Sequence, residues 1–190
     1  LTFWILQYSE KNGMNTLRLA VKKGKTLSNN SSWDIWDFTA LSINAAWKNQ
    51  WLDYNHAALS NNFLYIGTNI FNSNDSFTRC IVIRIPLDKL KDGNNISYNY
   101  FESKSDFSLR CVQGATKTMY FAAHGNAAGN NRIRVYAWPE NSINIKKTDV
   151  DITPWSGGQY SSKCPDGTNW LRRTDYRITG AWISKGIIGF

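Results

Sequence analysis

The feature that most constrains the fold is a hairpin that recurs along the chain. Each copy consists of an alternating apolar strand, a turn rich in Asn, Gly or Ser, and a second alternating strand. The copies cover residues 1–21, 63–86 and 118–139, and Tyr65 and Tyr120 hold the same place in the last two, 55 residues apart. Alternation with a period of two predicts β-strands, and repetition at this spacing predicts a series of similar antiparallel sheets.

Shorter alternating segments flank these hairpins. Residues 56–60 and 108–114 precede the second and third copies, and residues 96–101 and 143–152 follow them. Each complete unit is therefore expected to contain four strands. A fourth unit is expected to open at Arg177 and to stop within its second strand. The expected units are residues 1–45, 46–103, 104–153 and 154–190.

Small sheets with two apolar faces can bury both of them only by packing against a neighbour on each side. Radial stacking of four-stranded sheets is the architecture of a β-propeller, which typically has four to eight blades. The sequence therefore predicts an all-β fold, a partial β-propeller of about three four-stranded antiparallel blades in a single domain. Because 190 residues hold so few blades, we expect the chain to be truncated at both ends, with the remaining blades in a longer parent chain.

Several stretches of the chain resemble uncharacterised secreted β-propeller proteins of microbes. The resemblance covers about residues 50–190 and implies a propeller fold, an extracellular location and a longer parent protein, with no established catalytic set. The stretches that carry it are residues 51–69 (WLDYNHAALSNNFLYIGTN), 83–90 (IRIPLDKL), 121–124 (FAAH), 135–139 (VYAWP), 165–170 (PDGTNW) and 175–178 (DYRI).

The segments just before the innermost strands are expected to line one mouth of the propeller channel, where ligand sites concentrate. Acids and bases that converge there can bind a sugar or position a water molecule. Hydrogen bonding between neighbouring blades is the alternative explanation for the same side chains. The candidate ligand-binding residues are Asp53, Tyr54, His56, Arg110, Asp175, Tyr176 and Arg177.

The predicted function is recognition of a glycan, or of another polar or acidic ligand, at this mouth. A net charge of +8 favours acidic partners such as an acidic polymer, and exposed Trp and Tyr side chains can stack on sugar faces. Two alternatives stay open: a glycoside hydrolase of the sialidase type, and a scaffold that binds protein partners. If the chain is an enzyme, a glycoside hydrolase is the class expected.

Two segments are similar to sialidase motifs. Residues 83–86 (IRIP) match the Arg-Ile-Pro element of that family, but alternation places Arg84 opposite its isoleucine neighbours in an internal strand, which favours a structural role. Residues 162–170 (SKCPDGTNW) are similar to the Asp box, S-x-D-x-G-x-T-W, with altered spacing. We interpret them as an Asp-Gly turn with Trp170 as an anchor.

No cofactor or metal is predicted, because His56 and His124 fall on different strands without a metal-ligand spacing. Cys80, Cys111 and Cys164 lack the spacing of a zinc ribbon or a thioredoxin-type site, and whether two of them form a disulfide stays open. The basic residues match no nucleic-acid-binding motif. No apolar run approaches the roughly 18 residues of a membrane span, and no serine-hydrolase, P-loop or dinucleotide-binding motif is present.

Overall fold

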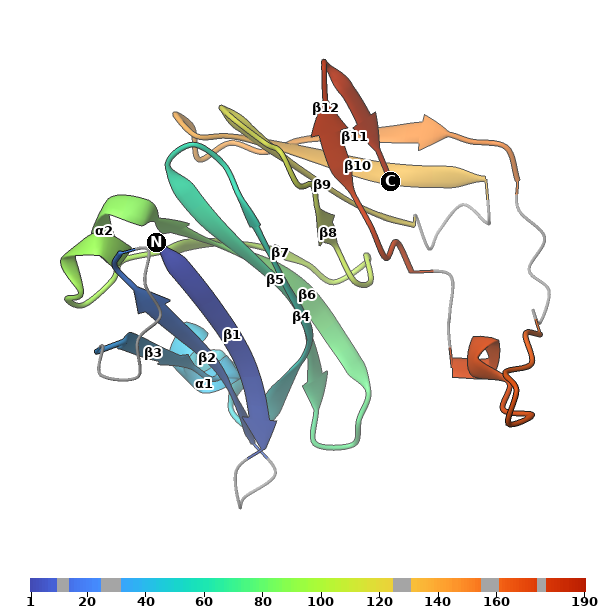
Figure 1. Ribbon diagram of the computed structural model, residues 1–190, viewed down its shortest axis with the longest axis horizontal. Helices are drawn as coiled ribbons and strands as arrows, with labels where there is room; N and C mark the ends of the chain where they lie inside the picture. The colour runs from blue at the N-terminus through green and yellow to red at the C-terminus, as the bar shows by residue number, and fades with distance from the viewer. Residues whose placement is uncertain (10–13, 25–31, 125–130, 155–160, 174–176) are drawn as a thin grey trace.

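The computed structural model describes residues 1–9, 14–24, 32–124, 131–154, 161–173 and 177–190. They form an all-β structure of antiparallel sheets that follow one another in space in the order of the chain (Figure 1). Apart from the sheets there are two short α-helices, α1 (Ala40–Ile43) and α2 (Leu87–Asp92), and two 3-10 helices, Ala45–Trp47 and Trp170–Arg173. No helix among these residues has the length and apolar character that crossing a membrane requires.

The first sheet has three strands among the described residues, β1 (Thr2–Ser9), β2 (Asn15–Lys22) and β3 (Asp34–Phe38). The second sheet is a four-stranded meander of β4 (Gln50–Leu59), β5 (Phe63–Asn72), β6 (Phe77–Pro86) and β7 (Asn99–Ser103). The third repeats that order with β8 (Arg110–Cys111), β9 (Thr118–His124), β10 (Arg132–Pro139) and β11 (Lys146–Asp151), and the fourth pairs β12 (Trp182–Ser184) with β13 (Ile187–Gly189).

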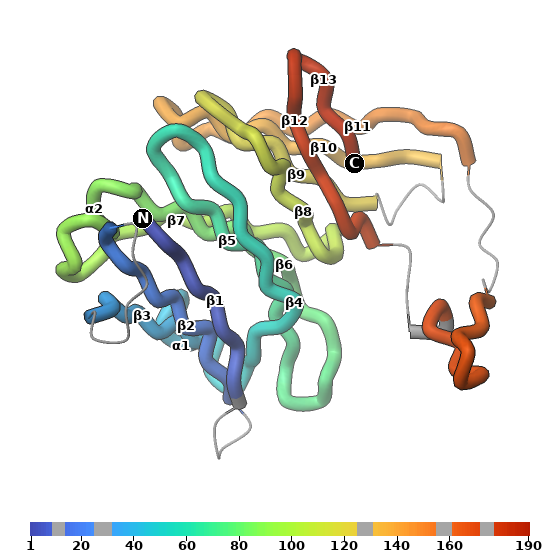
Figure 2. Tube along the Cα trace, in the orientation of Figure 1, coloured from blue at the N-terminus to red at the C-terminus, as the bar shows by residue number. Residues whose placement is uncertain are grey.

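These sheets confirm the all-β class and the repeated hairpins, which are β1–β2, β5–β6 and β9–β10. The expectation of four strands in each complete unit holds for the second and third sheets. The first sheet has no inner strand next to β1 among the described residues. The last unit begins its first strand at Trp182, five residues later than expected. The described residues form no closed ring of sheets (Figure 2).

Two hydrophobic cores hold the first three sheets together, because the second sheet is buried on both faces. From β6, Ile81, Ile83 and Ile85 enter the core shared with the first sheet, whereas Cys80 and Val82 enter the core shared with the third. Burial on both faces also explains why β5 and β6 are rich in apolar residues, most of them buried. A strand covered on both sides needs apolar residues at successive positions.

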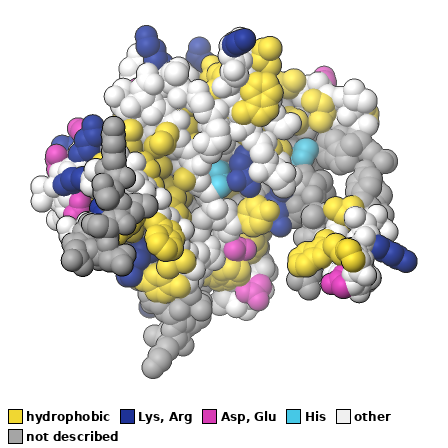
Figure 3. Space-filling model, viewed as in Figure 1, with side chains coloured by type: hydrophobic (Ala, Val, Ile, Leu, Met, Phe, Trp, Pro, Cys, Tyr) yellow, Lys and Arg dark blue, Asp and Glu magenta, His cyan; other side chains and the backbone are white. Residues whose placement is uncertain are grey.

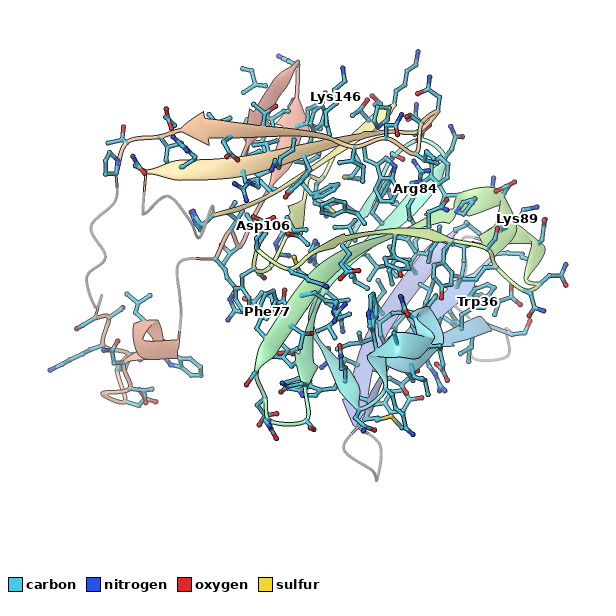
Figure 4. The ribbon with its side chains drawn as sticks, turned by 180° about the vertical axis from the view of Figure 1, so that it is seen from behind. Trp36, Phe77, Arg84, Lys89, Asp106 and Lys146 are labelled. Atoms are coloured by element: carbon cyan, nitrogen blue, oxygen red, sulfur yellow. The ribbon has the colours of Figure 1, made fainter. Side chains whose placement is uncertain are left out.

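Arg84 lies on the second of these faces, as its place between isoleucines predicts, and it joins the second sheet to the third (Figure 4). Its side chain is almost fully buried, and its guanidinium carbon lies 4.3 Å from the ring centroid of Trp138 and 4.8 Å from that of Phe63. Its Nη1 donates to the carbonyl oxygens of Pro139 (3.1 Å) and Ser142 (3.0 Å). The arginine of the sialidase-like segment is thus engaged by the protein itself.

Removing the side chain of Arg84 should lower the stability of the fold by a measurable amount. We expect Arg84→Ala to lower the free energy of unfolding by about 2–4 kcal/mol, because it removes a buried guanidinium that donates to two carbonyl oxygens and leaves a void beside two rings. Urea denaturation checks this value. Arg18→Ala is the matched control, since Arg18 forms a solvent-exposed ion pair with Asp37, and it should have a much smaller effect. Equal losses of unfolding free energy in the two variants would show that the buried contacts of Arg84 do not stabilise the fold more than an exposed ion pair does.

Candidate ligand-binding site at the inner strands

The inner strands β4, β8 and β12 lie side by side and are joined by specific hydrogen bonds. The backbone N–H of Cys111 donates to Nε2 of His56 (3.1 Å), and the side chain of Gln113 donates to the carbonyl oxygen of Ala57 (2.8 Å). Gln113 also forms a parallel bridge with Trp182 at the start of β12. These contacts align the three inner strands in one row, so that side chains from separate sheets meet.

The inner strand β4 contains a β-bulge in the middle of this row. Its register with β5 shifts between Asp53, which pairs with Asn69, and His56, which pairs with Gly67. Tyr54 in the bulge has a positive φ of 63° and is 37% exposed, and its backbone N–H donates to the carboxylate of Asp53 (2.8 Å). A non-glycine residue in the left-handed region is strained, and bulges of this kind often aim a side chain into a functional site.

Arg177, which precedes β12, covers the exposed ring of Tyr54. Its guanidinium carbon lies 3.8 Å from the centroid of the Tyr54 ring and 5.3 Å from that of Phe107. Cation–π contacts of this geometry orient the flat guanidinium against the ring face. Figure 3 shows basic side chains next to a histidine near the middle of the same face. The ring of Tyr54, exposed by the bulge, therefore holds the guanidinium of Arg177 at the surface.

The side chains of His56 and Arg110 each hydrogen-bond to the backbone of the unit that follows in the chain. His56 accepts from the backbone N–H of Cys111 in β8, and Nε of Arg110 donates to the carbonyl oxygen of Ile178 (3.2 Å), which precedes β12. Each side chain thus contacts the residue that follows its counterpart in the next unit. His56, Arg110 and Arg177 are therefore successive members of one series. The spacing of the hairpins did not reveal this series, because the bulge and the short β8 interrupt the repeat.

Burial and the positive charge of Arg110 lower the pKa of His56 to about 3, against a weaker opposing effect of the Tyr54 carbonyl. The imidazole is therefore neutral near pH 7, and its Nε2 serves as an acceptor. The ring lies across Gly67, where an added Cβ would meet the imidazole at 2.0 Å, so a larger residue at that position would displace it. His56 ties β4 to β8 and is not a cation available to a ligand.

A hollow of about 610 Å³ lies on the other side of β4, between β4 and β1. Gln7 spans its narrow end, where its amide nitrogen lies 3.5 Å from the carboxylate of Asp53 and its amide oxygen accepts from Asn55. The arginines of the inner strands do not line it. The residues that line the hollow are Phe3, Ile5, Gln7, Asp53, Tyr54, Asn55, His56 and Ala57.

Five of the candidate residues named from the sequence lie along this row of inner strands: Asp53, Tyr54, His56, Arg110 and Arg177. Asp175 and Tyr176 lie outside the described residues. Sequence reasoning missed Phe107 and Gln113, which precede and follow the two-residue β8. The burial pattern of so short a strand gives no periodic signal by which they could have been found.

The remaining sequence candidates are the cysteines and the Asp-box-like segment, and among them Cys111 lies on β8 in this row. Cys80, Cys111 and Cys164 are free thiols; burial raises the pKa of Cys80, and it raises that of Cys111 to about 12. The Asp-box-like segment forms the expected turn, with the backbone N–H of Thr168 donating to Asp166 (2.9 Å). Trp170, interpreted from the sequence as the anchor of this turn, is 54% exposed.

The described residues contain no group of three or more His, Cys, Asp or Glu side chains arranged to hold a metal ion. Comparisons with protein-family models, curated proteins and solved structures found no match to this chain. The chemistry of the site is therefore argued from its own residues. In this row the ring of Tyr54 stacks with Arg177, Asp53 accepts from the Tyr54 N–H, and Arg110 donates to the carbonyl oxygen of Ile178.

Proposed function

We propose that the chain is the ligand-recognition part of an extracellular β-propeller, and that the mouth formed by its inner strands binds an acidic glycan. The sheets stack in chain order, the second is covered on both faces, and the inner strands adjoin one another. This arrangement is what consecutive blades around a channel require. Ligand sites in such folds concentrate in the segments around the inner strands.

The observation that carries the proposal is the position of Arg177 over the strained, exposed Tyr54. A guanidinium held against a ring by its face has its N–H donors directed outward in its own plane, which suits the two oxygens of a carboxylate. Arg110 lies next in the same series, and the net charge of +8 attracts anions to the surface. The adjoining aromatic rings supply apolar surface for the face of a sugar.

The carboxylates at the mouth favour recognition of a glycan over its hydrolysis. Hydrolysis by the usual retaining or inverting mechanism needs two carboxyl groups flanking the scissile bond. Among the described inner-strand residues, Asp53 is the carboxylate beside Tyr54 and Arg177, and it accepts the N–H of the bulge. A carboxylate that supports the backbone conformation is better suited to shaping the site than to proton transfer.

The test is titration calorimetry with an oligosaccharide of uronic acids, with a sialylated oligosaccharide, and with neutral oligosaccharides of the same length. We expect an acidic ligand to bind more tightly than its neutral counterpart. Arg177→Ala should weaken this binding about 10- to 100-fold, as expected for loss of a charge-assisted hydrogen bond. Binding should also weaken as the salt concentration rises.

Lys89→Ala is the matched control, because Lys89 is an exposed cation on α2 (Figure 4). It changes the net charge equally and should leave the affinity unchanged. Absence of acidic-glycan binding, or equal weakening in both variants, would contradict the proposal. Turnover of a fluorogenic sialoside by the wild-type chain would favour the hydrolase instead.

A further inference from the structure

A groove of about 560 Å³ runs along β7, the outer strand of the second sheet, and shares no residue with the inner strands. Residues 98–102 all line this groove. Side chains alternate between the two faces of a strand, so successive residues can line one groove together only along the edge of the strand. Among the described residues β7 pairs with β6 alone. The edge that borders the groove therefore presents backbone N–H and C=O groups to which another strand can pair.

The opposite wall of the groove belongs to the third sheet. Residues 143–145, which lead into β11, form this wall together with Trp138 of β10. Arg84 marks one end of the groove, because its backbone pairs with Asn99 and its side chain donates to the carbonyl oxygen of Ser142 (3.0 Å), just before the opposite wall (Figure 4). The groove thus lies between two neighbouring sheets, with a strand edge on one side and a largely apolar wall on the other.

The charges on the outer strands distinguish β7 from its counterparts. Charged side chains on an edge strand discourage the addition of another strand. Among the described residues that line the groove, Glu102 is the only charged one, and Nη1 of Arg79 donates to its carboxylate (2.8 Å). Of the three outer strands, β7 is therefore the best suited to accept another strand. The other two carry more charges: Asp34 and Asp37 in β3, and Lys146, Lys147, Asp149 and Asp151 in β11.

We propose that the groove beside β7 binds an extended peptide of a partner protein, which adds to the edge of β7 as a fifth strand of the second sheet. In this kind of recognition, main-chain hydrogen bonds to the edge supply affinity and the contacts of alternate side chains supply specificity. The site is separate from the mouth formed by the inner strands, so a glycan and a peptide can be bound by different parts of the chain.

The walls of the groove determine the chemistry of the peptide. Its alternate side chains point towards the third sheet, where Trp138, Ile143 and Ile145 line the groove, and Ile143 is 77% exposed. β-Branched apolar residues suit these positions, since they favour extended strands. The intervening side chains lie on the face of the second sheet that includes Tyr98 and Tyr100. Because the single charge of the lining is already paired, the occupant is an uncharged segment in which β-branched apolar residues alternate with small polar ones.

The probe is a capped synthetic peptide, acetyl-STVTVTS-amide, added to the whole chain. Titration calorimetry gives its Kd, and hydrogen exchange followed by mass spectrometry gives the protection of each strand. At a peptide concentration of ten times Kd, exchange of the edge amides of β7 should slow about tenfold, because only about a tenth of the molecules then lack the peptide. The outer strand β11 is the internal control and should not change.

Ile143→Asp tests the apolar wall. The substitution places a charge where the peptide requires an apolar contact, so the affinity should fall at least about 10-fold. Val150→Asp is the matched control, because Val150 is an exposed apolar residue of β11 that does not line the groove. It adds the same charge and should leave the affinity unchanged. Both replaced side chains are exposed, so both variants should fold.

The same peptide with N-methylated backbone nitrogens keeps its side chains and loses the strand-pairing donors, so it should give no protection. No slowing in β7, equal slowing in β11, equal protection by the methylated peptide, or equal weakening in the two variants would each overturn the proposal. Protection of β7 that rises with protein concentration in the absence of peptide would also overturn it, because a second copy of the chain would then be the occupant. So would protection of β7 by a neutral oligosaccharide where the peptide gives none.

Discussion

Asp106→Ala should lower the free energy of unfolding by about 3–5 kcal/mol. Asp106 has no exposed surface and lies between the second and third sheets (Figure 4). Its carboxylate accepts from Oγ of Ser103 (2.6 Å), from the hydroxyl of Tyr136 (2.6 Å) and from Nη1 of Arg134 (3.2 Å). Alanine removes this shared acceptor, and the largely buried hydroxyl of Tyr136 loses its bond to it.

The neighbouring groups show how closely this network is coupled. Burial, and then the hydrogen bond to Asp106, raise the pKa of Tyr136, so the tyrosine remains a neutral donor. Arg134 also binds Asp149 of β11 through two contacts of 2.7 and 3.0 Å. The buried carboxylate therefore connects the loop after β7 to β10, and through Arg134 to β11.

Urea denaturation of Asp106→Ala, with its midpoint and slope fitted together, measures the effect. Asp149→Ala is the matched control, because it removes a more exposed partner of the same Arg134. Exposed ion pairs contribute little, so this variant should remain close to the wild type. If both variants lose the same stability, the buried carboxylate is not what joins these sheets.

Acidification should destabilise the wild-type chain through His56. The pKa of His56 is about 3 in the folded chain and about 6.5 when unfolded. Between these values the unfolded state binds a proton that the folded state does not, so the free energy of unfolding falls as the pH falls. At about 1.4 kcal/mol per pH unit, the loss approaches about 5 kcal/mol over the whole interval.

The comparison is between the wild type and His56→Gln, with unfolding measured at several pH values from 7 to 4.5. Carboxylates of the unfolded chain begin to titrate at the lower end of this interval, but they are the same in both proteins, so the difference between the two profiles reports on His56. The variant should be less stable at pH 7, because it loses the bond from Cys111, but its stability should depend less on pH. Parallel pH profiles for the two proteins would show that His56 is not the titrating group, since His124 is common to both.

Part of the candidate site was predictable, because a short segment precedes each of the later hairpins in the sequence. That order selected Tyr54, Arg110 and Arg177 as candidates, and the structure places the guanidinium of Arg177 over the Tyr54 ring. The role of His56 was not predictable, because its neutrality depends on burial among groups distant in the sequence. The hollow beside β1 was also missed, since it depends on the distance between two sheets and not on any local pattern.

Local alternation in the sequence by itself determined the paired strands of the β-hairpins and the face on which Arg84 lies. Side-chain direction in a strand reverses at every residue, so neighbouring residues suffice to predict these features. The tertiary structure decided the bulge at Tyr54, the network around Asp106 and the stacking of Arg177. Each of these depends on contacts between sheets whose residues are far apart along the chain, and no period in the sequence encodes which groups meet there.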